Sequence, residues 1–124
     1  KLLQRGKKIR LHDEGEPVRN WLHADDTAEA VISIIESGVF NEIYNVAGGF
    51  EQKNKETVRK IVECFFEDDR NYLDYVDLGY KRVGQDVRYA LNDDKLKKLG
   101  WEPKKNFDEE IVELVKYYKS NFRW

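Results

Sequence analysis

Two arginines six residues apart, Arg82 and Arg88, stand out among the residues of this chain that could do chemistry. A glycine, an amide and a carboxylate lie between them (Gly84, Gln85 and Asp86), and the segment has no helical periodicity. A guanidinium group can pair with two phosphate oxygens and stays charged at any relevant pH, while glycine lets a backbone approach a ligand closely. This composition predicts an anion-binding loop, although a solvated basic loop has the same composition.

Residues that enzymes use for catalysis or metal binding do not occur in recognised patterns. The two histidines, His12 and His23, have no partner at a metal-ligand spacing, so we expect no metal site. The sequence has no Gly-x-Ser-x-Gly motif, no P-loop and no Tyr-x-x-x-Lys pair. Cys64 lies in an apolar helical pattern, which favours a buried packing residue over a nucleophile. By its own residues the chain is predicted to bind a ligand without a catalytic centre.

Composition narrows the class of partner. The 124 residues suffice for one domain, and 37% of them are charged, yet the formal net charge is only −2. We therefore expect no nucleic-acid partner. No apolar run approaches the roughly 20 residues that span a bilayer, so we expect no membrane partner. The single cysteine excludes an internal disulfide and fits a reducing, cytoplasmic compartment.

The beginning of the chain has the pattern of a helix end. The sequence contains no methionine, and residues 1–8 read as the end of a helix that runs into Gly6. We therefore expect the chain to be a fragment of a longer protein, with residues 1–124 forming one binding domain.

Extended segments are predicted at four places, over residues 9–12, 18–23, 43–47 and 72–76. In the second segment, alternation places Arg19 and Trp21 on the same face. The third is apolar, as in a buried strand, and ends at Gly48-Gly49. The G-x-G-x-x-G spacing of a dinucleotide loop is absent there, so the two glycines are weak evidence for a cofactor site.

Three main helices and one short one are expected to pack on these strands, over residues 25–37, 55–66, 107–118 and 95–99. The first is apolar nearly all round, which predicts that it is buried between layers. Asn54 is the predicted N-cap of the second, and Asn106 with Glu109 forms a capping-box pattern before the last. Together the elements predict a small mixed α/β domain.

Several motifs of this chain follow the order found in one protein family. They are Gly15 followed by Val-Arg-Asn-Trp-Leu-His-Ala-Asp-Asp at 18–26, Tyr-Asn-Val-Ala-Gly-Gly at 44–49, Asn54, Arg-x-Gly-x-Asp-x-Arg-Tyr-Ala at 82–90, and Leu-Gly-Trp-Glu-Pro at 99–103. In these motifs the chain resembles the nucleotide-sugar dehydratases of the extended short-chain dehydrogenase/reductase superfamily. The closest likeness is to the dTDP-glucose 4,6-dehydratase family, and the motif at 82–90 separates it from related epimerases and decarboxylases.

The resemblance implies that the chain is the small α/β C-terminal lobe of such an enzyme. The Rossmann domain, with its NAD and its Tyr-x-x-x-Lys chemistry, would then lie before Lys1. The full-length enzyme would be a cytoplasmic homodimer that takes hydride from sugar C4, eliminates water across C5 and C6, and returns hydride to C6. The fragment would be inactive, with no catalytic residue and no bound cofactor. Its apolar surface toward the Rossmann domain would be exposed and would favour self-association.

The resemblance also assigns substrate contacts. Arg19 and Arg82 would contact the diphosphate or ribose of a nucleotide sugar, and Asn54 would hydrogen-bond nearby. Gln85 stands where the family has a substrate-contacting histidine, and His12 stands where it often has a tyrosine near the base.

Departures from the family pattern leave the exact nucleotide open. Val83 replaces a proline and Asn20 replaces an aspartate. Arg88 is interpreted equally well as a ligand contact or as a structural ion-pair residue. Two other functions stay open: a stand-alone binding or interaction module that has lost the reaction, and a related epimerase or reductase, which the arginine motif disfavours.

Overall fold

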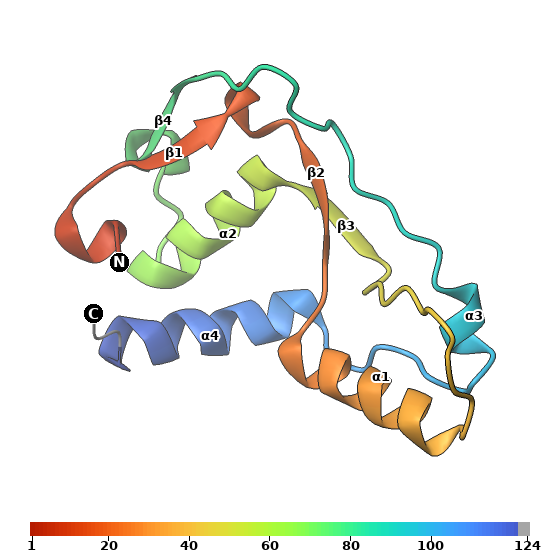
Figure 1. Ribbon diagram of the computed structural model, residues 1–124. Coiled ribbons are helices and arrows are strands. Elements are labelled where there is room, and N and C mark those ends of the chain that lie inside the picture. Colours follow the sequence, from red (N-terminus) through yellow and green to blue (C-terminus); the bar gives the residue numbers. More distant parts are fainter. Residues whose placement is uncertain (122–124) are drawn as a thin grey trace.

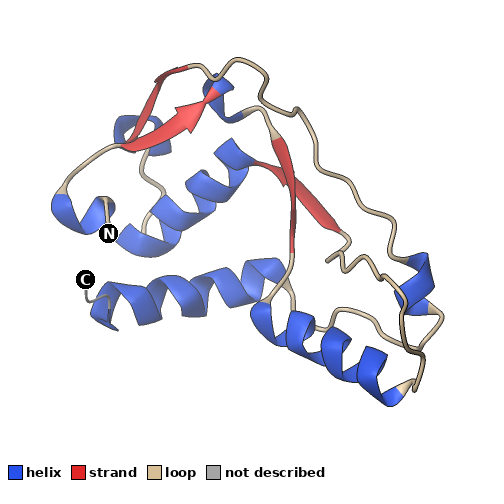
Figure 2. Cartoon of the chain, in the orientation of Figure 1, coloured by secondary structure: helices blue, strands red, loops and turns tan. Residues whose placement is uncertain are grey.

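The computed structural model describes residues 1–121 and has the predicted mixed α/β architecture (Figures 1 and 2). Its strands are β1 (Ile9–His12), β2 (Val18–Trp21), β3 (Phe50–Lys53) and β4 (Val76–Tyr80). Its α-helices are α1 (Ala24–Glu36), α2 (Asn54–Phe66), α3 (Asp94–Lys97) and α4 (Phe107–Asn121). Short 3-10 turns cover Leu3–Arg5, Asp13–Gly15 and Tyr72–Tyr75. Within residues 1–121, no helix combines the length and the apolar character that crossing a bilayer requires.

The strands form two separate pairs. β1 runs parallel to β4, with Ile9 opposite Val76 and His12 opposite Tyr80. β2 and β3 are antiparallel over their full lengths. β3 was not predicted, because its sequence Phe-Glu-Gln-Lys has few residues that favour a strand. Backbone pairing with β2, from a distant part of the chain, overrides that local preference.

Two of the predicted strands are wrong, in whole or in part. Residues 43–47 form no strand, and Ile43 is 86% exposed. An apolar run becomes a strand only when another edge accepts its hydrogen bonds, and no strand of the described residues pairs with this one. Residues 72–75 form a 3-10 turn, because the Asn71 side chain accepts the Leu73 N–H at 3.1 Å and favours a turn; the strand begins at Val76.

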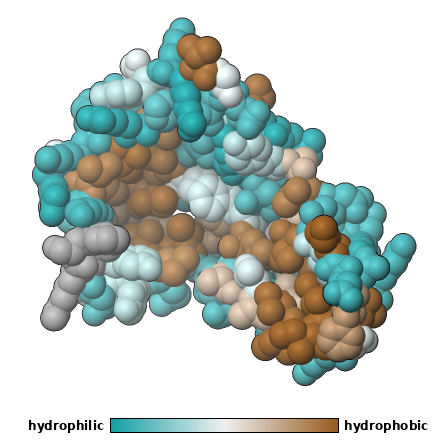
Figure 3. Space-filling model, in the orientation of Figure 1, coloured by the Kyte–Doolittle hydropathy of each residue, from teal (hydrophilic) through white to brown (hydrophobic). Residues whose placement is uncertain are grey.

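The bounds of helix α1 agree with the prediction, but its burial does not. Ala30 is fully buried, whereas Val31, Ile32 and Ile35 are 48%, 52% and 69% exposed. Figure 3 shows apolar side chains gathered on the surface over this helix. The prediction that α1 is buried between layers is therefore wrong for the described residues, because only one side of the helix meets another element of this chain.

The predicted cap of α2 is also wrong. Lys53 is the N-cap and makes no side-chain cap bond, while Asn54 is already the first helical residue. The Asn54 N–H donates to the Pro17 carbonyl at 3.0 Å, because β3 continues directly into α2. In contrast, Asn106 caps α4 as predicted: its Oδ1 accepts the N–H groups of Asp108 and Glu109 at 2.9 and 3.3 Å.

Two buried clusters hold these elements together. Leu11, Val58, Val62 and Val76 join the β1–β4 pair to α2, while Ala30, Leu96 and Trp101 join α1 to α3. The buried Asp26 carboxylate accepts the backbone N–H groups of Lys104 and Lys105 at 3.0 and 3.1 Å. The segment that leads into α4 is therefore tied to the first turn of α1.

Cys64 is half-buried on α2, as its apolar helical setting indicated. Burial, together with the neighbouring Glu63 carboxylate, raises the pKa of the Cys64 thiol. A raised pKa leaves little thiolate at neutral pH, which is the reactive form, so the geometry favours packing over nucleophilic chemistry.

Candidate functional site

The carboxyl ends of β1 and β4 bring together two of the predicted site residues. His12 ends β1 opposite Tyr80, which ends β4, and their ring centroids are 5.9 Å apart. The arginine loop, residues 82–90, leaves β4 two residues later and carries Arg82 at its start (Figure 1). His12 and Arg82 are both exposed. Parallel pairing thus places them at the same edge of the molecule.

The arginine loop then runs along the outer edge of β2. The Val18 N–H donates to the Val87 carbonyl at 2.7 Å, and the Tyr89 N–H donates to the Val18 carbonyl at 3.3 Å. These bonds form a parallel bridge between Val18 and Arg88. Main-chain bonds therefore hold the second half of the loop against the strand that carries Arg19.

Arg19 reaches into this loop. Its Nη1 donates to the Val18 carbonyl at 2.7 Å, and Nη1 and Nη2 donate to the Asp86 carbonyl at 3.2 and 3.3 Å. The guanidinium carbon lies 4.1 Å from the centre of the Tyr89 ring. Among residues 1–121 no carboxylate pairs with Arg19, so its half-buried positive charge is held by neutral oxygens and a ring.

The first half of the loop is open. Arg82 is exposed and makes no ion pair with any residue of the described chain, and its backbone carbonyl accepts the Gln85 N–H at 3.2 Å. Gly84 lies inside this turn at φ 74°, a left-handed conformation that favours glycine. The two arginines thus belong to one loop–strand unit, with Asp86, the partner of Arg19, four residues after Arg82, although the two side chains share no contact.

Arg88 forms an ion pair within the chain, which is the structural one of the two roles that the sequence left open. Its Nε and Nη2 donate to the Glu51 carboxylate of β3 at 2.7 and 3.1 Å, a two-bond pairing that raises the pKa of Arg88. The pair fastens the loop to the β2–β3 hairpin. In this geometry Arg88 positions the loop and does not offer its charge to a ligand.

Asn54, at the start of α2, lies beside a cluster of charges. Glu16 pairs with Lys53 at 2.7 Å and also with Lys55, so the turn before β2 is bound to the beginning of α2. Gly15 allows the close approach, because a Cβ there would lie 2.7 Å from the Lys55 Cβ. Asn54 itself is half-buried. The structure thus places Asn54 next to the turn that joins His12 to Arg19.

The ion pairs of Glu16 predict an unusual titration. Hydrogen bonds from Lys53 and Lys55 lower the pKa of Glu16 to about 2. Since the folded-state pKa is depressed, the pairs stabilise the fold above the unfolded-state pKa, and this contribution disappears as the pH falls toward 2. We expect NMR of the Glu16 side chain to give a midpoint near 2. Replacing both lysines with methionine should return it toward 4.5, and a midpoint near 4.5 in the unmodified chain would contradict the pairing.

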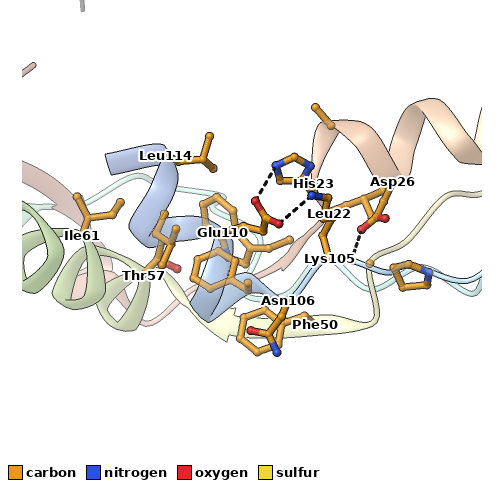
Figure 4. A pocket seen from close by; sticks show the side chains of 16 residues that line it. Leu22, His23, Asp26, Phe50, Thr57, Ile61, Lys105, Asn106, Glu110 and Leu114 are labelled. Atoms are coloured by element: carbon orange, nitrogen blue, oxygen red, sulfur yellow. Dashed lines mark hydrogen bonds and ion pairs between the residues drawn. The ribbon is translucent and has the colours of Figure 1, made fainter. Parts of the chain in front are cut away.

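Sequence reasoning missed a cavity of about 290 Å³ that lies beside β2 and β3, between α2, α4 and the start of α1 (Figure 4). Its lining is Trp21, Leu22, His23, Ala24, Asp26, Gly48, Phe50, Thr57, Ile61, Pro103, Lys105, Asn106, Phe107, Glu110, Ile111 and Leu114. None of the five predicted substrate-contacting residues lines it. Apolar residues at helical spacing predicted a core at this place, and nothing in the sequence indicated that the core would stay open.

The charged groups of this cavity lie close to one another, whereas Trp21 Nε1 and Thr57 Oγ1 are buried without a hydrogen-bond partner among the described residues. His23 lies 3.6 Å from Asp25 through Nδ1 and 3.7 Å from Glu110 through Nε2, and Lys105 pairs with Glu110 at 2.9 Å. In the part of the chain that the structure describes, no three His, Cys, Asp or Glu side chains are arranged to hold a metal ion. On the arginine loop and β2, by contrast, Arg82 and Arg19 have no carboxylate partner among residues 1–121, so that unit is the better candidate for binding an anion.

Comparison with known proteins shows that this chain is similar to sugar-nucleotide 4,6-dehydratases. A family model described as GDP-mannose 4,6 dehydratase matches residues 2–114. The dTDP-glucose 4,6-dehydratase of Shigella flexneri is 32% identical, over 96% of this chain and 34% of its own length. The dTDP-D-glucose 4,6-dehydratase of Bos taurus is 36% identical, over 98% of this chain and 35% of its own length. The chain thus spans about a third of the length of the curated relatives it matches.

A solved structure resembles the whole described fold. DesIV, the dTDP-glucose 4,6-dehydratase of Streptomyces venezuelae, was crystallised with NAD bound. It is similar with a TM-score of 0.84 and 30% sequence identity, over 97% of this chain and 36% of that protein. The loop, strands and helices described above therefore have counterparts in about a third of that enzyme.

Proposed function

This chain belongs to the GDP-mannose 4,6 dehydratase family, and from that premise we propose that it is the substrate-binding part of a dTDP-glucose 4,6-dehydratase. The observation that carries the proposal is the loop–strand unit of Arg19 and Arg82, in which both guanidinium groups lack a carboxylate partner among residues 1–121. A nucleoside diphosphate supplies the anionic oxygens that such groups bind in pairs. Residues 1–124 would form this single binding domain.

Arg19 would bind the diphosphate. Its present partners are neutral carbonyl oxygens, so a phosphate can replace the Asp86 carbonyl without breaking an ion pair. The hydrogen bond to the Val18 carbonyl and the contact with the Tyr89 ring would keep the Arg19 guanidinium oriented while the phosphate binds. Arg19 would therefore present a charge whose direction is set before the ligand arrives, which lowers the cost of ordering it.

Arg82 and Gln85 would close over the ligand from the open half of the arginine loop. The Glu51–Arg88 pair fastens the end of the loop, while the turn around Gly84 leaves its start exposed. Arg82 would add a second charge to the diphosphate, and the half-buried Gln85 a neutral donor. His12 at the end of β1 would lie near the base, and Asn54 would bond nearby.

The rest of the reaction would belong to the longer protein. In the proposed reaction, hydride would leave sugar C4, water would be eliminated across C5 and C6, and hydride would return to C6. The product would be dTDP-4-keto-6-deoxyglucose. NAD supplies the hydride chemistry when bound, outside this chain. We also propose a cytoplasmic homodimer for the full-length enzyme; the single half-buried cysteine supports the compartment, and the family resemblance implies the dimer.

The longer protein should therefore convert dTDP-glucose in the presence of NAD. Mass spectrometry should detect a product that has lost one water, and NMR should show a keto group at C4 and a methyl group at C6. A parallel reaction with UDP-glucose in place of dTDP-glucose tests which nucleotide the enzyme prefers. A protein that binds dTDP-glucose but forms no dehydrated product would overturn the proposed reaction.

The isolated chain should bind dTDP-glucose only weakly. Exposed charge pairs contribute about 0–1 kcal/mol, and the part of the enzyme that would shield this site from water is missing. We expect an NMR titration of residues 1–124 to give a Kd of about 1 mM or weaker, with shifts at Arg19, Asn54 and the arginine loop. A micromolar Kd would show that the site is complete within this chain. It would contradict the proposal that the rest of the enzyme is needed to shield the site from water.

A further inference from the structure

Strand β4 contains one residue more than β1 between their last two paired positions. Arg10 lies opposite Asp77 and His12 lies opposite Tyr80, so two steps along β1 face three steps along β4. The Asp77 side chain accepts the Gly79 N–H at 3.0 Å and holds this irregular backbone in place. In a regular strand Tyr80 and Asp77 would point to opposite faces, but the extra residue turns the Tyr80 ring to the face of Arg10 and His12.

The Tyr80 ring joins these two side chains into one cluster, which we call the Tyr80 cluster (Arg10, His12 and Tyr80). The Arg10 guanidinium carbon lies 4.8 Å from the centre of the ring, and the His12 ring meets it edge-on, with the centroids 5.9 Å apart. Arg10 and His12 are exposed, and Tyr80 is half-buried. Within residues 1–121, none of the three side chains makes a hydrogen bond or an ion pair, so their N–H and O–H groups are free to meet a ligand.

The Tyr80 cluster borders the candidate phosphate site. Arg82 follows Tyr80 by two residues, which separates their Cα atoms by at most about 7 Å. Figure 1 shows this end of β4 continuing into the arginine loop. In a nucleoside diphosphate, only the sugar ring and one methylene group separate the base from the phosphates. A single nucleotide can therefore reach both the arginine loop and the cluster.

A nucleobase matches the groups that the cluster offers. An aromatic side chain stacks on any base, and bases also stack on guanidinium planes. Arg10 supplies donors only, and a histidine ring supplies a donor in either protonation state. Exocyclic carbonyl oxygens, which thymine, uracil and guanine have and adenine lacks, are the acceptors that such donors select. The cluster therefore favours a base that carries a carbonyl oxygen.

We propose that the Tyr80 cluster is the base-binding surface of this site, with Tyr80 as the ring on which the base stacks and Arg10 as the donor that selects a carbonyl oxygen. Neither residue is among the five predicted substrate contacts. His12 supports the Tyr80 ring from its edge and adds a second donor. The inference rests on the proposed function, because a base is expected here only if Arg19 and Arg82 bind a diphosphate.

The test compares dTDP with inorganic pyrophosphate, by calorimetry on the full-length enzyme loaded with NAD. Tyr80→Leu should weaken dTDP binding about tenfold and leave pyrophosphate binding unchanged, because a stacking contact affects the base alone. Tyr80→Phe keeps the ring and should bind dTDP as the unmodified enzyme does. Tyr117→Leu removes a tyrosine that is 59% exposed on α4, across α2 from the β1–β4 pair, and should change neither affinity.

A second comparison tests the carbonyl oxygen. The unmodified enzyme should prefer dTDP to dADP, which has the same sugar and the same charge but no carbonyl group on its base. Arg10→Met keeps an apolar side chain and removes the donors, so it should narrow this preference. The loss of positive charge affects both nucleotides alike, and the ratio of their affinities therefore reports on the base.

A third readout needs no loss of the ring. In enzyme labelled only at tyrosine, nuclear Overhauser contacts should join the thymine methyl group of dTDP to one ring, and Tyr80→Phe should remove them. The inference is overturned if these contacts are absent, or if Tyr80→Leu keeps its affinity for dTDP or weakens both ligands equally. If the unmodified enzyme binds neither dTDP nor pyrophosphate, the proposed phosphate site fails, and the base-binding surface fails with it.

Discussion

Replacing Arg19 with alanine in the full-length enzyme is expected to raise KM for dTDP-glucose about ten- to a hundredfold. A hydrogen bond to a charged group contributes about 1.5–3 kcal/mol when it is shielded from water, and each 1.4 kcal/mol is a factor of ten. Arg82→Ala should have an effect in the same direction. Affinity for NAD should not change in either variant, because neither guanidinium is assigned to the cofactor. Steady-state kinetics at several substrate concentrations, together with an NAD titration, measure both quantities.

The controls separate binding from general damage to the fold. Arg19→Lys keeps the positive charge but loses the paired donors of the guanidinium. It should therefore recover part of the affinity that Arg19→Ala loses. Arg70→Ala removes an exposed guanidinium that pairs with Asp68 on the segment before β4, whereas the arginine loop follows β4, and it should leave KM unchanged. If Arg19 and Arg82 bind one diphosphate, the double variant should lose less than the sum of the two. An unchanged KM in both single variants would remove these residues from the site.

Gly48→Ala is expected to lower the free energy of unfolding by about 3 kcal/mol, at the upper end of the cost of overpacking. A Cβ at Gly48 would lie 2.0 Å from the Trp21 carbonyl oxygen and 2.9 Å from the Trp21 carbonyl carbon. Those are backbone atoms of β2, so they cannot rotate away as a side chain would. The backbone of one segment must shift, which would also strain the bond from the Gly48 N–H to the Asn20 side chain at 2.9 Å.

Urea unfolding followed by circular dichroism measures this loss. Gly79→Ala is the matched control, because Gly79 also has an ordinary φ and the nearest atom to an added Cβ there is a side-chain oxygen at 3.3 Å. It should change the stability by less than about 1 kcal/mol. If Gly48→Ala is no more harmful than Gly79→Ala, residues 47–48 do not lie against β2 as described.

The close packing of Gly48 also explains the role of this glycine pair. Read in the sequence, Gly48-Gly49 invited a cofactor-loop interpretation that the spacing did not support. In the structure, Gly48 lets the backbone at this position lie directly against the end of β2, and the Asn20 side chain accepts the Gly48 N–H there. Asn20 was noticed only as a departure from the family motif, and its bond to a distant backbone N–H could not be predicted from its neighbours.

The sequence by itself determined the features whose causes are local. Helices α2 and α4 repeat apolar residues at helical spacing, and Asn106 caps the second of them, so their places could be predicted to within a few residues. A helix closes its hydrogen bonds within its own segment, which is why periodicity and capping residues suffice. The arginine motif predicts an anion-binding loop from residue type alone, and that role stays a prediction for the binding experiments to test.

Only the tertiary structure decided which groups meet. Residues 43–47 form no strand because no partner edge accepts them, while the polar β3 forms one because β2 does. Glu51 takes Arg88 out of the candidate site and leaves Arg19 to neutral carbonyls, a distinction between two arginines that residue type cannot make. The exposed face of α1 and the open cavity between α2, α4 and the start of α1 have the same origin. Strand pairing, ion pairing and burial depend on surfaces supplied from far along the chain, so a local pattern leaves them undetermined.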